Sequence, residues 1–131
     1  MTDLEQAQQN STAPWTTVFR EEMHYIVFQD AYPVTHGHLL FVPKWNKSYC
    51  INQCFSDAME LGEFLIESGE CDGYNVGINR GHAAGQTVMY PHVHLIPRRT
   101  GDCADPTGGV RGVIPAQQNY KKETYRHVDQ E

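Results

Sequence analysis

The stretch that most constrains the fold of this chain runs from Gln86 to Arg99 and reads QTVMYPHVHLIPRR. In a β-strand successive side chains point to opposite faces, so alternate residues share a face. One face would carry Val88, Tyr90, His92, His94 and Ile96, and the core-facing side would carry Met89, Val93 and Leu95. The pattern therefore predicts a strand with two imidazoles about 7 Å apart on the face away from the core.

Periodicity elsewhere predicts further strands and one main helix. Alternating or apolar runs indicate a strand, a turn and a strand over residues 17–30, and further strands over 38–43 and 73–79. Residues 56–69 repeat apolar side chains at helical spacing, with Ser56 as the expected N-cap and Gly69 as the expected C-cap. Together these elements favour an α+β fold, with an antiparallel five-stranded sheet, one main helix and a short one.

Length and composition predict a single globular domain. The chain has 131 residues, which suffices for one core but hardly for two. Residues 1–14 are polar and acidic and are expected to form a flexible N-terminal lead-in. The domain proper is expected over residues 15–116, followed by a charged C-terminal tail over 117–131.

Charge and hydropathy narrow the partners and the compartment. A net charge of −6 disfavours a nucleic-acid polymer or an anionic membrane as the partner. No run of 18 apolar residues is present, and residues 1–14 lack the features of a signal peptide. We therefore expect a cytoplasmic protein. The four cysteines, at positions 50, 54, 71 and 103, offer no second pair at zinc-site spacing, so ordinary thiols are expected.

Two chemistries fit a His-x-His pair on a strand. The pair could place two nitrogens on one metal ion, aided by the HGH stretch at 36–38. Alternatively, one histidine could attack phosphorus while the other donates a hydrogen bond to the phosphate. The second chemistry is favoured by the loop just upstream, GHAAGQT, because its backbone N–H groups and the Thr87 hydroxyl suit an anion.

At this point the residues resemble a known family, the histidine triad (HIT) nucleotide hydrolases and transferases. Its core, His-φ-His-φ-His-φ-φ with φ apolar, follows Asn-x-Gly and Gly-Gln-[Ser/Thr]; here the region reads NRGHAAGQTVMYPHVHLIPRRTGD. The stretch FQDAYPVTHGHLLFVPK resembles the family pattern D-x-x-P-x-x-x-G-H-x-L-φ-φ-P-K. GGVRGVIP resembles a segment of bacterial members, which favours the bacterial diadenosine-polyphosphate-hydrolase-like branch. The resemblance covers residues 25–115 and implies a HIT-like fold.

One triad position departs from the family pattern. His94 precedes Leu95, Ile96 and Pro97 and takes the third position, so His92 takes the middle one. Tyr90 then stands where the family has its first histidine. The alternative register, with His94 in the middle and Ile96 third, would misplace both Gln86 and Pro97. Because the family is thought to use a backbone carbonyl near the first position, a tyrosine there need not abolish catalysis.

The resemblance implies roles by position. His92 would attack the α-phosphorus and become a nucleotidyl-histidine. The phosphate would be held by His94, Asn79, Gly85, Gln86, Thr87 and Val88. Asp30 would bind the ribose, and Ile26 and Phe28 would lie near the base. His38 and Tyr90 would not contact the substrate themselves but would lie behind the residues that do and position them. Trp15 and Trp45 could each line the cleft or a dimer surface.

The expected reaction is hydrolysis of a nucleoside phosphoramidate or a dinucleoside polyphosphate to a nucleoside monophosphate. No cofactor is required, although the substrate could arrive as a magnesium complex, and the family implies a homodimer. Three alternatives stay open. The chain could be a nucleotide-binding or interaction module with weak turnover because of Tyr90, a His-x-His metalloprotein, or a phosphorolytic transferase.

Overall fold

The structure is a computed structural model that describes residues 1–122. Its contacts divide the chain into two compact units, Met1–Arg99 and a second unit that begins at Thr100. The division after Arg99 differs from the expected domain, which was predicted to continue to residue 116. Of the predicted C-terminal tail, residues 123–131 lie outside the described part.

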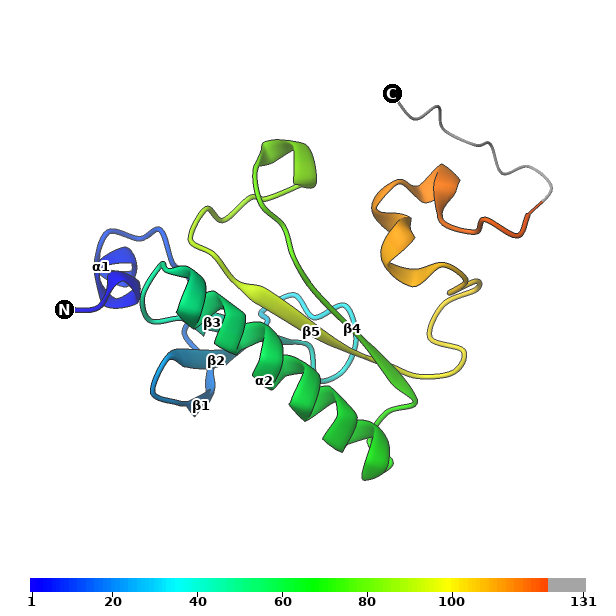
Figure 1. The fold of residues 1–131 in the computed structure, drawn as a ribbon, viewed down its shortest axis with the longest axis horizontal. Coiled ribbons are helices and arrows are strands. Elements are labelled where there is room, and N and C mark those ends of the chain that lie inside the picture. Colours follow the sequence, from blue (N-terminus) through cyan, green and yellow to red (C-terminus); the bar gives the residue numbers. More distant parts are fainter. Residues whose placement is uncertain (123–131) are drawn as a thin grey trace. The chain divides into compact units, whose positions relative to one another are not determined.

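The first unit is built on a five-stranded sheet in which every strand is antiparallel to its neighbours (Figure 1). The strand order is β1-β2-β3-β5-β4. The strands are β1 (Val18–Glu21), β2 (Tyr25–Gln29), β3 (Leu39–Pro43), β4 (Gly73–Ile78) and β5 (Val93–Arg98). With helices α1 (Asp3–Gln9) and α2 (Ser48–Glu67), this arrangement confirms the predicted α+β fold class.

Each face of the sheet has its own hydrophobic cluster. The long helix α2 covers one face, where Cys54 and Ala58 pack on Val27, Phe41 and Leu95. On the opposite face a smaller cluster joins residues of the N-terminal segment to alternate residues of β2 and β3. It consists of Leu4, Ala7, Ala13, Phe28, Leu40 and Val42. The period-2 alternation of each strand therefore separates a helix-covered face from the face that carries the histidines.

The N-terminal segment is not the flexible lead-in that the sequence predicted. Residues 3–9 form α1, and Thr2 and Glu5 complete a capping box at its start. Leu4 is 1% exposed and Ala7 is 5% exposed. The prediction weighed polar composition, but two apolar residues three apart on a helix suffice to dock it on the sheet.

Helix α2 begins eight residues earlier than predicted. Lys47 precedes its first turn, so Ser56 lies inside the helix and is not its N-cap. Cys50, Cys54 and Ala58 are all fully buried and continue the apolar stripe towards the N-terminus, which is why the helix extends there. The predicted end is confirmed: Gly69 has φ +82°, and Glu70 N–H bonds the Leu65 carbonyl as in a Schellman motif.

The histidine strand is shorter than predicted. Residues 86–92 are irregular, and strand pairing starts only at Val93, after Pro91. From there the predicted alternation is confirmed, since Val93 and Leu95 are fully buried and His94 lies on the other face. Met89 is half exposed rather than core-facing, because the chain has not yet entered the sheet.

The second unit contains two short 3-10 helices, Gly109–Val113 and Pro115–Gln117. Asp105 accepts hydrogen bonds from the Asn119 amide and Thr107 N–H, and these bonds lower the pKa of Asp105 to about 2.

Within residues 1–122 no helix has the length and apolar character needed to cross a bilayer. All four cysteines are free, and burial raises the pKa of Cys54 to about 12.

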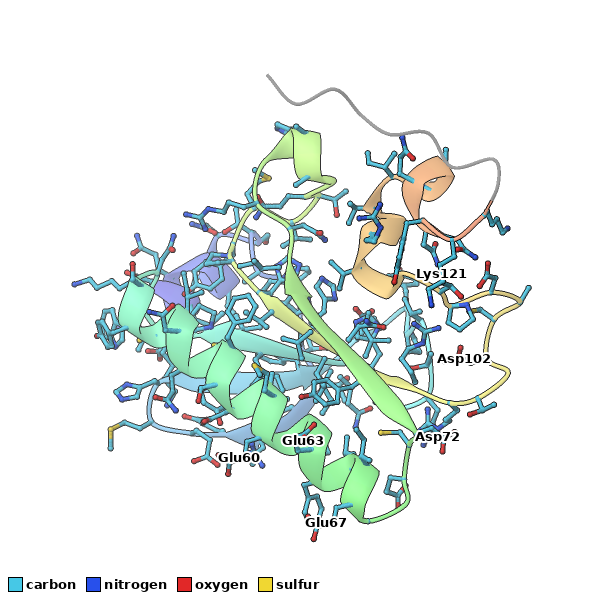
Figure 2. The ribbon with its side chains drawn as sticks, turned by 45° about the vertical axis from the view of Figure 1, so that its right-hand side comes forward. Glu60, Glu63, Glu67, Asp72, Asp102 and Lys121 are labelled. Carbon is cyan, nitrogen blue, oxygen red and sulfur yellow. The ribbon has the colours of Figure 1, made fainter. Side chains whose placement is uncertain are left out.

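Gly62 provides a test of the packing between α2 and β4. A Cβ at this position would lie 2.7 Å from two ring carbons of Tyr74. Although alanine favours a helix by about 1 kcal/mol over glycine, overpacking costs about 1–3 kcal/mol. We expect Gly62→Ala to lower the melting temperature, measured by circular dichroism. Glu60→Ala, on the exposed side of the same helix (Figure 2), is the control and should leave it unchanged. A more stable Gly62→Ala would contradict the packing argument.

Candidate functional site

A cleft on the histidine face brings most of the predicted site residues together. Its volume is about 570 Å³. The predicted residues in its wall are Asp30, His38, Asn79, Gly85, Gln86, Thr87, Val88, His92 and His94. They come from the ends of β2, β4 and β5 and from the loops that flank β3 and β5. Trp15, for which the sequence left the cleft and a dimer surface open, also lines the cleft, together with Tyr32 and Val34, which the sequence pattern had not assigned to it.

The structure does not bring Ile26 and Phe28 into this cleft. Phe28 is 1% exposed and its ring centroid lies 6.2 Å from that of Trp15. Both residues line a neighbouring hollow that shares Trp15 with the cleft. The resemblance had implied that they lie near the base, but both pack with Trp15 in the smaller hydrophobic cluster instead.

The loop between β4 and β5 is a tight turn held by two glycines. Gly81 and Gly85 have φ of +91° and +84°, a region that favours glycine, and a 3-10 turn, His82–Ala84, lies between them. Gln86 is 5% exposed and braces this loop from inside. Its amide oxygen accepts from Gly81 N–H at 2.7 Å, and its amide nitrogen donates to the Val88 and Met89 carbonyls at 3.1 Å each. Gln86 therefore shapes the loop, and its amide hydrogens are not available to a phosphate.

His92 has a fixed orientation and a fixed tautomer. Its Nδ1 lies 2.8 Å from the backbone carbonyl of Tyr90. A carbonyl oxygen only accepts, so Nδ1 carries the proton and Nε2 of the neutral ring keeps its lone pair. The carbonyl contact expected at the first triad position is thus present in the structure.

A second chain of contacts fixes the other imidazoles. The Val34 backbone N–H donates to Nδ1 of His38 at 3.1 Å, so the proton of neutral His38 is on Nε2. That nitrogen lies 2.9 Å from Nδ1 of His94, which therefore accepts, and the His94 proton is on Nε2. Nε2 of His94 is buried and has no hydrogen-bond partner among the described residues. His94 thus offers the cleft an uncommitted N–H donor.

Burial keeps this pair of rings neutral near pH 7. Desolvation, followed by the proximity of His92 and His38, lowers the pKa of His94 from 6.5 to about 4. Desolvation also lowers the pKa of His38, although the Asp30 carboxylate, 3.5 Å away, acts in the opposite direction. A neutral His94 donates one N–H and adds no charge to the cleft.

Asp30, His38 and His94 are close enough to be considered as metal ligands. One ligand atom of each lies within 4.8 Å of the others. The donor set fits poorly, however. A neutral histidine that binds a metal through Nε2 carries its proton on Nδ1, and Nδ1 of His38 already faces the Val34 N–H. Metal binding would place two donors against each other unless residues 31–37 moved.

Tyr90 holds His92 through its backbone carbonyl, while its side chain is anchored elsewhere. Its ring packs against the smaller cluster, and its hydroxyl donates to the Pro43 carbonyl at 2.6 Å. Burial raises the pKa of this phenol above its usual value, so it stays protonated. The predicted role of Tyr90 as a supporting residue agrees with these contacts, which tie residue 90 to the end of β3.

The fold and the cleft define a small α+β domain with a histidine-centred site beside a glycine loop. The HIT domain family model matches residues 11–101, so the chain belongs to the HIT family. This result confirms the resemblance found in the sequence.

Several known proteins are similar to the chain. An adenosine 5'-monophosphoramidase of Saccharomyces cerevisiae is 35% identical over 75% of the chain and 61% of its own length. An adenylylsulfatase of Arabidopsis thaliana is 28% identical over 70% of the chain and 49% of its own length. The chain thus spans half to three fifths of these two relatives. A zinc-bound histidine triad family protein of Mycobacterium smegmatis superposes with a TM-score of 0.65 at 26% identity, covering 79% of this chain and 80% of that one.

The Tyr90 hydroxyl is expected to matter for stability more than for turnover. Tyr90→Phe removes the bond to Pro43, which we expect to cost about 1 kcal/mol in unfolding free energy. The carbonyl that holds His92 is unaffected by the change, so kcat/KM should stay within about tenfold, or ~1.4 kcal/mol. Urea unfolding and steady-state kinetics on one substrate measure both. A loss of activity of 10²-fold would assign the hydroxyl a direct role.

The depressed pKa of His94 predicts acid sensitivity. Between pH 6.5 and about 4 the unfolded chain binds a proton at residue 94 that the folded chain does not. The unfolding free energy should therefore fall as the pH drops through this window and level off, for this group, below it. His94→Gln should show a shallower decline in urea midpoint between pH 7 and pH 4.5 than the unchanged protein. An equally steep decline would mean that other groups cause the sensitivity.

Proposed function

We propose that the protein is a HIT-type nucleotide hydrolase that forms a nucleotidyl-histidine on His92. The observation that carries the proposal is the set of hydrogen-bond partners of His92 and His94, which assign the two rings opposite tautomers. Tyr90 O holds the His92 proton on Nδ1 and leaves Nε2 free to attack, whereas His38 holds the His94 proton on Nε2 and makes it a donor. One nucleophile and one donor, with ring centroids 5.2 Å apart, suit attack on phosphorus.

The first step exchanges one bond at phosphorus for another. The Nε2 lone pair of His92 attacks the α-phosphorus, and the bond from phosphorus to the leaving group breaks with its electron pair. The Thr87 hydroxyl and the N–H groups of Thr87 and Val88, which line the cleft, would bind the phosphate, because the N–H groups of Gly85 and Gln86 donate to carbonyls within the loop. The His94 N–H hydrogen-bonds the developing negative charge or the departing atom.

The second step restores the enzyme. Water attacks the same phosphorus, the P–N bond breaks with its electron pair returning to Nε2 of His92, and the proton lost by the attacking water passes to solvent, which releases a nucleoside monophosphate. Asp30 lies in the cleft wall, where its carboxylate can accept hydrogen bonds from ribose hydroxyls. Its Oδ1 is also an acceptor for Tyr32 N–H at 2.7 Å, which holds the carboxylate in place.

The names of two relatives favour small nucleotide substrates. One is a monophosphoramidase and the other an adenylylsulfatase. We therefore propose an adenosine phosphoramidate or a related mixed anhydride as the first substrates to assay, with diadenosine polyphosphates beside them. Phosphate dependence of the products separates hydrolysis from phosphorolysis. A homodimer, expected from the family, and a cytoplasmic location are proposed with the function.

A metal-dependent function is the second candidate, because one structural neighbour is described as zinc-bound. The Val34–His38 contact argues against metal binding at Asp30, His38 and His94, and we propose that the reaction needs no resident metal. Elemental analysis of the purified protein after chelation, compared with its remaining activity, decides between the two.

The central test replaces the nucleophile. His92→Asn should lower kcat by at least 10³-fold, or about 4 kcal/mol of transition-state stabilisation. Affinity for AMP, measured by isothermal titration, should stay within about tenfold, because the loop and His94 remain. Thr16→Ala, a change of an exposed residue at the cleft rim, is the matched control. An unchanged rate in His92→Asn would refute the assignment, and a binding module would show AMP affinity without any turnover in the unchanged protein.

A further inference from the structure

The smaller hydrophobic cluster, to which the N-terminal arm (residues 3–17) contributes, is linked to His92 through Trp15 and through Tyr90. Trp15 lies with its ring centroid 4.8 Å from that of His92, at an interplanar angle of 55°. Tyr90, whose carbonyl holds Nδ1 of His92, packs on the same cluster. Leu4 and Ala7 of α1 supply buried side chains of this cluster.

The arm is fastened at both ends by hydrogen bonds. At its start, Leu4 N–H donates to the Lys44 carbonyl at 3.0 Å, and the Asp3 carboxylate accepts from Asn46 N–H at 2.8 Å. At its end, the Thr17 carbonyl accepts from Gln29 N–H at 2.8 Å. Between these points Trp15 is half-buried against Phe28. The arm is therefore a defined element that presents the indole at one place.

The imidazole of His92 is confined by three different groups. The Tyr90 carbonyl holds Nδ1, the His94 ring lies 5.2 Å away between centroids, and Trp15 covers a further side. A hydrogen bond to one nitrogen restrains the ring along one direction only, so packing on its faces is needed to limit the remaining rotation. Small misplacements of a reacting group cost as much as 10²-fold in rate.

We propose that Trp15 is a positioning residue for His92 and that α1 acts on the site through it. The inference rests on the proposed function, in which Nε2 of His92 attacks phosphorus. The family model matches residues 11–101, so α1, Asp3–Gln9, lies outside the matched segment. Its buried residues link the stability of the arm to the orientation of the nucleophile.

The primary test observes the ring of His92 directly and needs no turnover. Long-range ¹H–¹⁵N NMR reports which imidazole nitrogen carries the proton, with the His92 signal assigned by its loss in His92→Asn. In the unchanged protein His92 should be almost entirely the Nδ1–H tautomer. Trp15→Ala should produce a mixture of tautomers, and Trp15→Phe should restore the single form. An unchanged tautomer in Trp15→Ala, in a protein that melts normally, would overturn the proposal.

Kinetics supply a second readout. At saturating substrate, Trp15→Ala should lower kcat about tenfold, whereas Trp15→Phe should stay within about threefold. Trp45→Phe, which changes the other tryptophan, should alter neither kcat nor the His92 tautomer. A rise in KM alone, with kcat unchanged, would mean that Trp15 only contacts the substrate and would overturn the positioning role.

The contribution of α1 is tested separately with Leu4→Asp. A carboxylate in place of a side chain that is 1% exposed should undock the helix while Trp15 is retained. We expect the same mixture of His92 tautomers as in Trp15→Ala. The NMR signals of residues on the α2 face of the sheet should stay dispersed, which shows that the rest of the fold is intact. A single Nδ1–H tautomer in the undocked protein would refute the link to α1. If no nucleotide is hydrolysed by the unchanged protein, the proposed function fails, but the tautomer measurements still decide the packing role.

Discussion

The site depends on the alternation of β5 between two faces of the sheet. This strand pairs with β3 on one side and β4 on the other, and Val93 and Leu95 are fully buried beneath α2. A shift of the pairing by one residue would exchange these side chains for His94 and move an imidazole into the helix-covered core. The apolar face of β5 thus fixes the position of its polar face, and the cleft follows from the packing of the core.

Backbone groups then set the protonation of the imidazoles. The Tyr90 carbonyl can only accept and the Val34 N–H can only donate, and neither titrates. His92 therefore keeps a free Nε2, and His94, through the His38 side chain, keeps a proton on Nε2. This arrangement explains how tyrosine can stand at the first triad position: the carbonyl that matters is common to all residues, and the phenol is free to bond Pro43 instead.

The sequence predicted those elements in which apolar residues recur at a regular spacing. The alternation of residues 92–96 predicted that the two histidines lie on the face away from the buried Val93 and Leu95, and two motifs in the expected order identified the family. The prediction failed where contacts between residues far apart in the sequence determine the local structure. Residues 3–9 are mostly polar, so only docking on the sheet reveals a helix whose Leu4 is buried. The start of α2 was not predicted because the buried residues of its first turns are cysteines. Nothing in the sequence around Trp15 indicates whether its side chain lies in the cleft or on another surface.

The cleft, like the protein as a whole, has no excess of basic side chains. The chain carries a net charge of −6, and none of the described residues that line the cleft is lysine or arginine. Arg98 and Arg99, which follow the histidines, bond the Asn75 amide oxygen and the Glu70 and His36 carbonyls instead. Phosphate recognition would then rest on uncharged donors, the loop N–H groups and a His94 kept neutral by burial. Neutral donors bind a charged product less tightly than a fixed cation would, because a hydrogen-bonding dipole attracts an anion more weakly and over a shorter range than a full positive charge does. A cleft without lysine or arginine can therefore stabilise charge as it develops at phosphorus and still release a monophosphate.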